Sequence, residues 1–201
     1  MRAVTRRPRL KSMRERTSED TPNSPPSIGL ESGKVTLTPY SPQWAVLYER
    51  EKQQLEVAIG HLVVDIQHVG STAIPSIAAK PIIDIGIAVK NFEDAAVCVD
   101  PMERLGYEYR GENGIPRRHY FVKGRPSTHH IHMVEIASEE WLALVSFRDY
   151  LRTHSDAASR YAQLKHGLAR NFATERKSYQ CAKAPFITEV ITRAKQEGQT
   201  L

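Results

Sequence analysis

The sequence predicts an α+β (mixed α/β) fold in which a group of strands is followed by a helical C-terminal layer. Three observations predict this fold class. Apolar residues recur at helical spacing over residues 44–62, short β-rich runs with one helical crossover fill residues 63–136, and the last third returns to helical spacing. Strands gathered in the middle of a chain and flanked by helices are typical of such domains.

Composition places the chain among globular proteins. Its 201 residues are 40% apolar, which is enough to build a core. No stretch approaches the roughly 18–20 apolar residues of a membrane span, and the N-terminus lacks the apolar segment of a secretory signal. We therefore expect a cytoplasmic protein without a membrane span. Cys98 and Cys181 lie outside any C-x-x-C pair, which predicts two free buried thiols, with a single disulfide as the alternative.

The first 33 residues differ in composition from the rest. Residues 1–33 carry seven Arg and Lys against four acids and are rich in Ser and Pro, whereas residues 34–201 carry 21 against 19. A segment of this composition cannot bury enough apolar surface to fold. We expect a disordered basic tail at 1–33, with a transit peptide as the alternative, and one folded domain at 34–201. The domain lacks a strong basic excess, so we expect no specific nucleic-acid partner.

The first elements follow this tail. Residues 35–37 predict a short strand. Ser41-Pro42 marks a helix start, because serine accepts a hydrogen bond from the first free N–H groups and proline tolerates the first helical position. The helix over residues 44–62 precedes a β-rich run at 63–69, which ends in the turn Gly70-Ser71-Thr72.

Later elements are predicted in the same way. Residues 81–89 form the clearest strand, and Asn91 and Asp94 can cap the helical crossover that follows. A strand at 107–110 precedes a hairpin. The remaining segments are two hairpin strands at 117–123 and 130–136, and three apolar helical stripes: Trp141, Leu144, Val145 and Phe147; Tyr161, Leu164, Leu168 and Phe172; and Phe186, Ile187, Val190 and Ile191.

Asp84 is unusual because it interrupts an apolar strand, where aspartate is disfavoured. Side chains alternate along a strand, so the isoleucines around it face a core while Asp84 and Gly86 share the other face. A small, polar face is typical of a cleft lining. We interpret Asp84 as a functional carboxylate, and the alternative is a strand-end residue that caps neighbouring backbone.

The turn Gly70-Ser71-Thr72 follows an apolar strand and precedes the Asp84 strand. Glycine permits close approach of a ligand, and the backbone N–H groups and two hydroxyls supply donors for a phosphate. Turns of this composition are common without a ligand. The nearby carboxylate favours the phosphate-binding interpretation.

Two histidines, His130 and His132, share one face of a predicted strand. Imidazoles at this spacing can bind one metal ion or contact one phosphate. Glu135 falls on the opposite face, so it is a poor partner for them. A hydrogen-bonded histidine pair without a ligand is the alternative.

Cationic residues are dense in the predicted hairpin, where Arg118 lies on the opposite face from Arg117. A solvated, charged edge is the ordinary interpretation, and contact of one or two cations with an anionic ligand is the functional one. Lys183 on the last helix is a further candidate phosphate contact. Arg148 and Asp149 predict a structural salt bridge.

Resemblance to the GrpB family rests on four ordered segments. They are HVGSTAIPSIAAKPIIDI at 68–85, HIHMVE at 130–135, FRDYLR at 147–152 and YQCAKAPFI at 179–187. The resemblance runs from about residue 35 to residue 194. It implies a sheet similar to that of the nucleotidyltransferase superfamily, and GrpB domains are in some bacteria fused to dephospho-CoA kinase.

The resemblance also implies roles for individual residues. Gly70 and Ser71 match the phosphate-binding turn of the superfamily, and Asp84 matches its first, catalytic metal-binding carboxylate. Gly86 departs from the pattern, because active members usually carry a second carboxylate there. His130 or His132 occupies the region of the third acid, and two-metal nucleotidyl transfer needs carboxylates for both ions.

Two main hypotheses follow. In the first, the protein is an enzyme that binds a nucleotide at Gly70 and Ser71. Asp84 with His130 and His132 then holds a divalent metal, Mn²⁺ or Mg²⁺ with Zn²⁺ possible on this ligand set, while charge is neutralised by Lys80, Arg118 and Lys183. In the second, the domain binds a nucleotide or CoA-like ligand without catalysis. An accessory domain without a ligand is a third interpretation.

Overall fold

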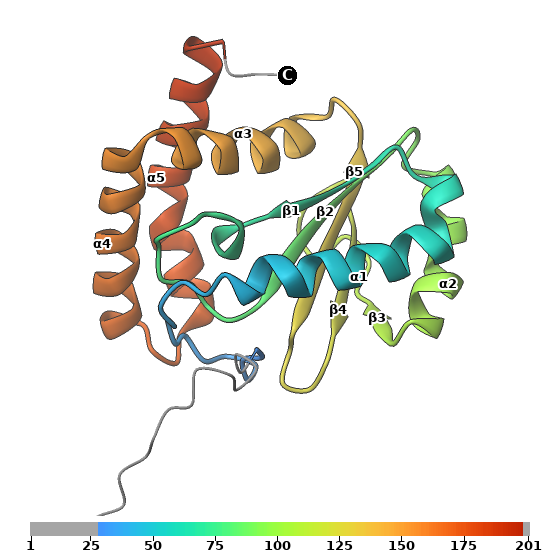
Figure 1. Ribbon diagram of the computed structural model, residues 1–201, viewed down its shortest axis with the longest axis horizontal. Coiled ribbons are helices and arrows are strands. Elements are labelled where there is room, and N and C mark those ends of the chain that lie inside the picture. The colour runs from blue at the N-terminus through green and yellow to red at the C-terminus, as the bar shows by residue number, and fades with distance from the viewer. Residues whose placement is uncertain (1–27, 199–201) are drawn as a thin grey trace, which may run out of the picture.

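The structure, a computed structural model, describes residues 28–198 (Figure 1). Its helices are α1 (Gln43–Ile59), α2 (Val99–Arg104), α3 (Glu139–Thr153), α4 (Ser155–Asn171) and α5 (Arg176–Gln196), with short 3-10 helices η1 (Gly60–Leu62), η2 (Ser71–Ala73) and η3 (Asp94–Cys98). Its strands are β1 (Asp65–Val69), β2 (Ile83–Val89), β3 (Tyr107–Tyr109), β4 (His119–Lys123) and β5 (His129–Glu135). The predicted α+β fold class is confirmed, with a helical layer at the C-terminus.

The five strands form one mixed sheet in the order β1-β2-β5-β4-β3. β2 and β5 are parallel, and the other neighbouring pairs are antiparallel. The parallel pairing places Asp84 opposite His130 and Gly86 opposite His132, while Tyr120 of β4 lies opposite His132. Because residues opposite each other share a face, the carboxylate and both imidazoles lie on the same side of the sheet.

The other side of the sheet is the main hydrophobic core. α1 crosses this face in Figure 1, and α2 packs at its end. Trp44, Tyr48, Leu55 and Ile59 recur at helical spacing along α1 and are buried. They pack against the odd-numbered positions of the strands: Ile83, Ile85, Ile87, Phe121, Ile131 and Met133.

The C-terminal helices cover one half of the Asp84 face. Trp141 and Val145 of α3 pack on Ala88 and Val134, at the end of the parallel strand pair. α4 and α5 pack against α3, and the three helices share a second core with the segment after η2. The part of the face that carries Asp84 therefore lies beside this helical layer and is not covered by it.

The strands begin and end within about two residues of the predicted bounds. The predicted strand at 35–37 is wrong. Val35 N donates to Ala173 O (2.8 Å), and Thr38 pairs with Ala79 as an isolated bridge. The backbone of this segment forms its hydrogen bonds with the α4–α5 loop and with the connection before β2, and not with the edge of the sheet.

The start of the folded part lies earlier than predicted. Residues 28–33 were expected in the tail, but Gly29 N donates to Pro81 O (2.8 Å) and Leu30 pairs with Ser127 as an isolated bridge. These backbone bonds hold the segment against the connections before β2 and β5. The rest of the predicted tail, residues 1–27, lies outside the described residues.

The two predicted helix starts have different outcomes in the structure. The Ser41 hydroxyl accepts from Gln43 N (3.3 Å), which agrees with a serine at the start of α1. Asn91 and Asp94 were expected to cap a helix, but the Asn91 amide donates to the Asp94 carboxylate (2.7 Å), and η3 has no side-chain cap. The two side chains satisfy each other.

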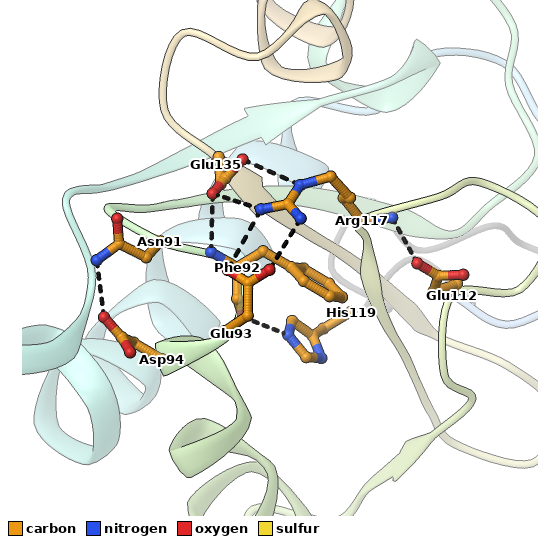
Figure 2. A network of polar contacts seen from close by, with 8 residues as sticks. All are labelled: Asn91, Phe92, Glu93, Asp94, Glu112, Arg117, His119 and Glu135. Atoms are coloured by element: carbon orange, nitrogen blue, oxygen red, sulfur yellow. Dashed lines mark hydrogen bonds and ion pairs between the residues drawn. The ribbon is translucent and has the colours of Figure 1, made fainter.

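The loop after β2 is tied to β4 and β5 by a polar network (Figure 2). Arg117 donates to Glu93 (2.8 Å) and to Glu135 (2.9 Å), and Glu135 accepts from Phe92 N (3.0 Å). The guanidinium also lies 5.2 Å from the centroid of the Phe92 ring. Arg117 and Glu135 thus lie away from the Asp84 face, as strand alternation predicts.

Within residues 28–198, no helix is long and apolar enough to cross a membrane. Cys98 and Cys181 are both free, as predicted. The predicted burial holds for Cys98 and is wrong for Cys181, which lies on an exposed position of α5.

Candidate functional site

The Asp84 face of the sheet opens into a cleft of about 1910 Å³. Strands β2, β4 and β5 form its floor, and residues of α3, α4 and α5 form the facing wall. All the residues that the sequence predicts to bind a metal, a nucleotide or a phosphate line this one cleft: Gly70, Ser71, Thr72, Lys80, Asp84, Arg118, His130, His132 and Lys183. Segments far apart in the sequence therefore meet at one candidate site.

Asp84 contacts both histidines on the floor of the cleft. His130 Nδ1 lies 3.2 Å from Asp84 Oδ1, and His132 Nε2 lies 3.7 Å from the same oxygen. The Tyr120 ring packs against both imidazoles, with centroids 5.6 Å and 5.3 Å apart. The aromatic ring fixes the two histidines beside the carboxylate.

The charge state of this group follows from burial and hydrogen bonding. Burial alone would raise the pKa of Asp84, but the hydrogen bond from His130 and the nearby His132 ring outweigh it and hold that pKa well below its ordinary value. Burial lowers the pKa of His130 below its ordinary value. Asp84 is therefore an ionised acceptor near pH 7, and the neutral His130 donates its Nδ1–H to it.

Arg118 holds His132 in a defined orientation. Its guanidinium is buried and donates to the backbone oxygens of Glu112 (3.0 Å) and Asn113 (2.9 Å), and its Nη1 lies 3.3 Å from His132 Nδ1. An arginine can only donate, so His132 Nδ1 accepts and Nε2 carries the proton that faces Asp84. Arg118 thus contacts His132 and also lines the cleft, and its predicted contact with a phosphate stays a prediction.

These donors fit a metal ion poorly. A histidine that binds a metal through Nε2 carries its proton on Nδ1, where His132 meets the donor Arg118. Both imidazoles offer Asp84 an N–H and not a lone pair. In agreement, residues 28–198 contain no cluster of three or more His, Cys, Asp or Glu side chains arranged to hold a metal ion.

Two glycines set the space around Asp84. Gly70 has φ +71°, and a Cβ there would lie 2.6 Å from Asp84 Oδ2, so the turn approaches the carboxylate as only glycine allows. A Cβ on Gly86 would lie 3.2 Å from Val69 Cγ1 and 3.3 Å from Trp141 Cζ3. The place of the second carboxylate in the superfamily is therefore filled by apolar packing.

Ser71 and Thr72 differ in what their hydroxyls do. Thr72 is buried, and its hydroxyl donates to Ile82 O (3.3 Å) and lies 3.0 Å from His68 Nε2. Burial lowers the pKa of His68 to about 4, so its neutral ring can donate to this hydroxyl. The Thr72 side chain thus ties the turn to β2, whereas the half-buried Ser71 hydroxyl lines the cleft without a partner in the described part of the chain.

Cations from α5 and from the connection before β2 line the cleft. Lys183 Nζ lies 4.7 Å from the centroid of the Tyr179 ring and Lys80 Nζ lies 5.9 Å from it. Burial, with the charges of Arg176 and Lys183, lowers the pKa of Lys80 to about 8. Across residues 28–198, none of these three cations forms an ion pair with a carboxylate.

Three further residues of the cleft lining were not singled out from the sequence as candidate ligand contacts. Lys165, Arg176 and Tyr179 line the same cleft. Lys165 carries a visible signal, because it interrupts the apolar stripe of α4. Arg176 opens α5 after a loop and has no local pattern that marks it.

The predicted ion pair outside the cleft is present. Arg148 Nε donates to Asp149 Oδ1 (2.7 Å), and Arg148 also donates to Gln67 Oε1 (2.8 Å) and His68 O (3.0 Å). Arg148 therefore joins α3 to β1, which confirms its structural role.

Comparison with known proteins decides the family. A family model described as GrpB protein matches residues 34–193. The chain belongs to the GrpB family. This confirms the resemblance that the four segments carry.

GrpB relatives cover most of this chain. The glutamate-rich protein GrpB of Alkalihalophilus pseudofirmus is 35% identical over 170 residues, which are 82% of this chain and 98% of that protein. A UPF0157 protein of Pseudomonas aeruginosa is 37% identical over 166 residues, 80% of this chain and 68% of the relative. The crystal structure of conserved protein GrpB from Enterococcus faecalis has a TM-score of 0.76 at 34% identity and covers 82% of this chain and 99% of that one.

Some relatives of this GrpB chain are longer. A dephospho-CoA kinase of Mycolicibacterium paratuberculosis is 26% identical over 188 residues, which cover 80% of this chain and 46% of the relative. A UPF0157 protein of Bacillus subtilis is 39% identical, and the matched region covers 48% of its length. This chain therefore spans about half of each of these two relatives.

Proposed function

We propose that this GrpB protein binds a nucleotide or another phosphate-bearing small molecule in its cleft. The observation that carries the proposal is the set of cations that line the cleft, Lys80, Arg176 and Lys183, none of which forms a direct ion pair with a carboxylate in the described residues. Like charges held close together repel one another, most strongly where water is partly excluded. An anionic ligand between them would remove this cost.

The Gly70-Ser71 turn supports the same ligand class. Gly70 lets the backbone approach closely, and the Ser71 hydroxyl faces the cleft without a partner in residues 28–198. Backbone N–H groups and a hydroxyl are ordinary phosphate contacts. The cleft volume of about 1910 Å³ is large enough for a nucleotide or a CoA-like molecule. The likeness to proteins named dephospho-CoA kinase adds CoA to the ligands worth testing.

Metal-dependent nucleotidyl transfer is a second candidate. It is favoured by the contact of Asp84 with His130 and His132 on the cleft floor. In this candidate function, Asp84 must bind a divalent ion such as Mn²⁺, Mg²⁺ or Zn²⁺ in place of an imidazole N–H. His132 must also lose its hydrogen bond from Arg118. Because apolar packing fills the position of the second carboxylate at Gly86, the geometry favours binding without two-metal catalysis.

A thermal-shift experiment with ATP, CTP and CoA tests the proposal. A ligand that binds the native state raises its melting temperature. We expect a shift with at least one of the three that does not depend on Mn²⁺ or Mg²⁺. A shift that needs the metal and is lost in Asp84→Ala would support nucleotidyl transfer. No shift with any of the three would contradict ligand binding and favour an accessory role.

A pair of variants locates the ligand. Lys183→Met removes a cation of the cleft wall and should abolish most of the nucleotide shift. Lys195→Met removes an exposed cation from the same helix, outside the cleft, and should leave the shift unchanged. Equal loss in both variants would mean that nucleotides bind through general surface charge.

A further inference from the structure

Lys165 is a buried cation on α4 whose ammonium group is only partly satisfied. Its residue is 1% exposed, its Nζ donates to Ala78 O (2.5 Å), and Nζ lies 4.6 Å from the centroid of the Tyr161 ring. An ammonium carries three donors. Among residues 28–198 it forms no ion pair. A buried charge without a counter-ion destabilises a fold, so packing alone does not account for this lysine.

The surroundings of Lys165 point toward the cleft. Both Lys165 and Tyr161 line it. Burial and then the charge of Lys183 lower the pKa of Lys165, and Lys183 also contributes to the lowered pKa of Lys80. Lys80 in turn interacts with Asp84. Lys80 and Lys183 lie over the same Tyr179 ring, Lys165 lies over the Tyr161 ring, and all three lysines line the cleft; they are called the row of cations below.

We propose that Lys165 anchors the far end of a polyphosphate chain, so that the ligand of the cleft is a di- or triphosphate and not a monophosphate. This inference rests on the proposed function and adds the class of ligand to it. The first phosphate contacts the Gly70-Ser71 turn, and the following ones lie along the row of cations. A single phosphate at the turn leaves Lys165 without a partner.

The chemistry of the row matches such a chain. Successive phosphates place negative charges at regular intervals, and each charge-assisted hydrogen bond to a lysine is stronger than a neutral one. A fully buried ammonium gains most from this, because water does not screen it. An anion that reaches the end of the cleft would thus accept a hydrogen bond from Lys165 and serve as its counter-ion.

Isothermal titration with inorganic phosphate, pyrophosphate and tripolyphosphate tests the inference. Affinity for the wild-type protein should rise with chain length, with tripolyphosphate at least about tenfold tighter than phosphate. Lys165→Met should weaken tripolyphosphate by about tenfold or more and change phosphate by less than about twofold. Lys195→Met, which removes an exposed lysine outside the cleft, should change neither.

A second variant separates charge from structure. Lys165→Gln retains a donor for Ala78 O but has no charge, and it should also lose the preference for tripolyphosphate. Circular dichroism and melting temperature check that both variants are folded. If Lys165→Met unfolds, the Gln variant decides.

The outcomes distinguish this inference from the proposed function. Tripolyphosphate that binds no more tightly than phosphate, or not at all, overturns the role of Lys165. So does a Lys165→Gln variant that binds tripolyphosphate like the wild type. In either case, a thermal shift with ATP, CTP or CoA leaves the proposed ligand binding in place.

Discussion

At the scale of single residues, the site is defined by the groups that contact Asp84. One oxygen of its carboxylate faces both imidazoles, and the other lies against the Gly70 backbone. The low pKa of Asp84 keeps it an acceptor, and Arg118 fixes the tautomer of His132. Gly70 thus constrains the position of Asp84, and Arg118 determines which nitrogen of His132 carries the proton.

Gly70→Ala should destabilise the fold by about 2–4 kcal/mol, because its backbone conformation strains any other residue and the new Cβ would collide with the Asp84 carboxylate. Gly111→Ala is the matched control. It also has a positive φ (+59°) but open space around it, so it should cost about 1–2 kcal/mol. Urea unfolding of both variants measures the difference. Equal costs would mean that the contact with Asp84 is unimportant.

Lys165 gives a pH dependence of known sign. Its pKa falls from 10.5 to about 7 on folding, so between these values the unfolded chain binds more protons and stability rises with pH. The penalty is full below pH 7 and disappears toward pH 10.5. Between pH 7 and 9 the unfolding free energy of the wild type should increase by about 2–3 kcal/mol relative to Lys165→Met. Urea unfolding of both proteins at each pH measures this change. A difference in unfolding free energy between wild type and Lys165→Met that stays constant with pH would contradict the buried charge.

Single residues of the site were predictable where a local pattern exposed them. Asp84 interrupts an apolar strand, and His130 and His132 share a face through strand alternation, so their common side follows from sequence. Their contact depends on the parallel pairing of β2 with β5, which no local pattern encodes. Thr72 was assigned to phosphate because its hydroxyl looks free in sequence, and only the fold reveals its bond to Ile82 O.

At the scale of elements, the packing of α3 on β2 decides which part of the sheet stays open. Trp141 covers Ala88, Val134 and the Gly86 position, whereas Asp84 lies beyond the end of this cover. Gly86 is therefore required by the helix and is not a vacant ligand position. A side chain at this position would collide with Val69 and Trp141.

Gly86→Asp should not restore a two-metal site. The new carboxylate would be buried between Val69 and Trp141, and we expect a loss of about 3 kcal/mol or more of stability, without metal-dependent stabilisation. Gly167→Ala on α4 is the control, because nothing lies within 4 Å of its Cβ position and it should be neutral or slightly stabilising. Thermal unfolding with and without Mn²⁺ measures both. A stable Gly86→Asp protein with a Mn²⁺-dependent shift would refute this packing argument.

Elements were predicted best where hydrophobic period was strong. The apolar run of β2 and the helical stripes of α3 to α5 gave the correct type of element. The prediction of a strand at 35–37 was wrong, because a run of three apolar or β-branched residues does not indicate whether it pairs with a strand or with a loop. The predicted tail boundary failed for a related reason: residues 28–33 have a disorder-like composition, and backbone bonds to distant segments hold them.

At the scale of the whole molecule, the cleft is the space between a sheet and a helical layer that meet along only half of their facing surfaces. The sheet supplies Asp84 and the histidines, the helices supply Lys165, Arg176 and Lys183, and the connection before β2 supplies Lys80. The overall class was predictable from the order of elements. Lys80 and Lys183 were singled out from sequence, whereas Lys165 and Arg176 were not, since their place in the cleft depends on how α4 and α5 pack against the sheet.

A crystal structure of the protein with the nucleotide that gives the largest thermal shift tests the account most directly. We predict phosphates in the cleft, with the first at Ser71 and the last within hydrogen-bond distance of Lys165, and with Lys183 between them. A nucleotide bound on another surface, or one that lies in the cleft with its phosphates turned away from these lysines, would contradict the account.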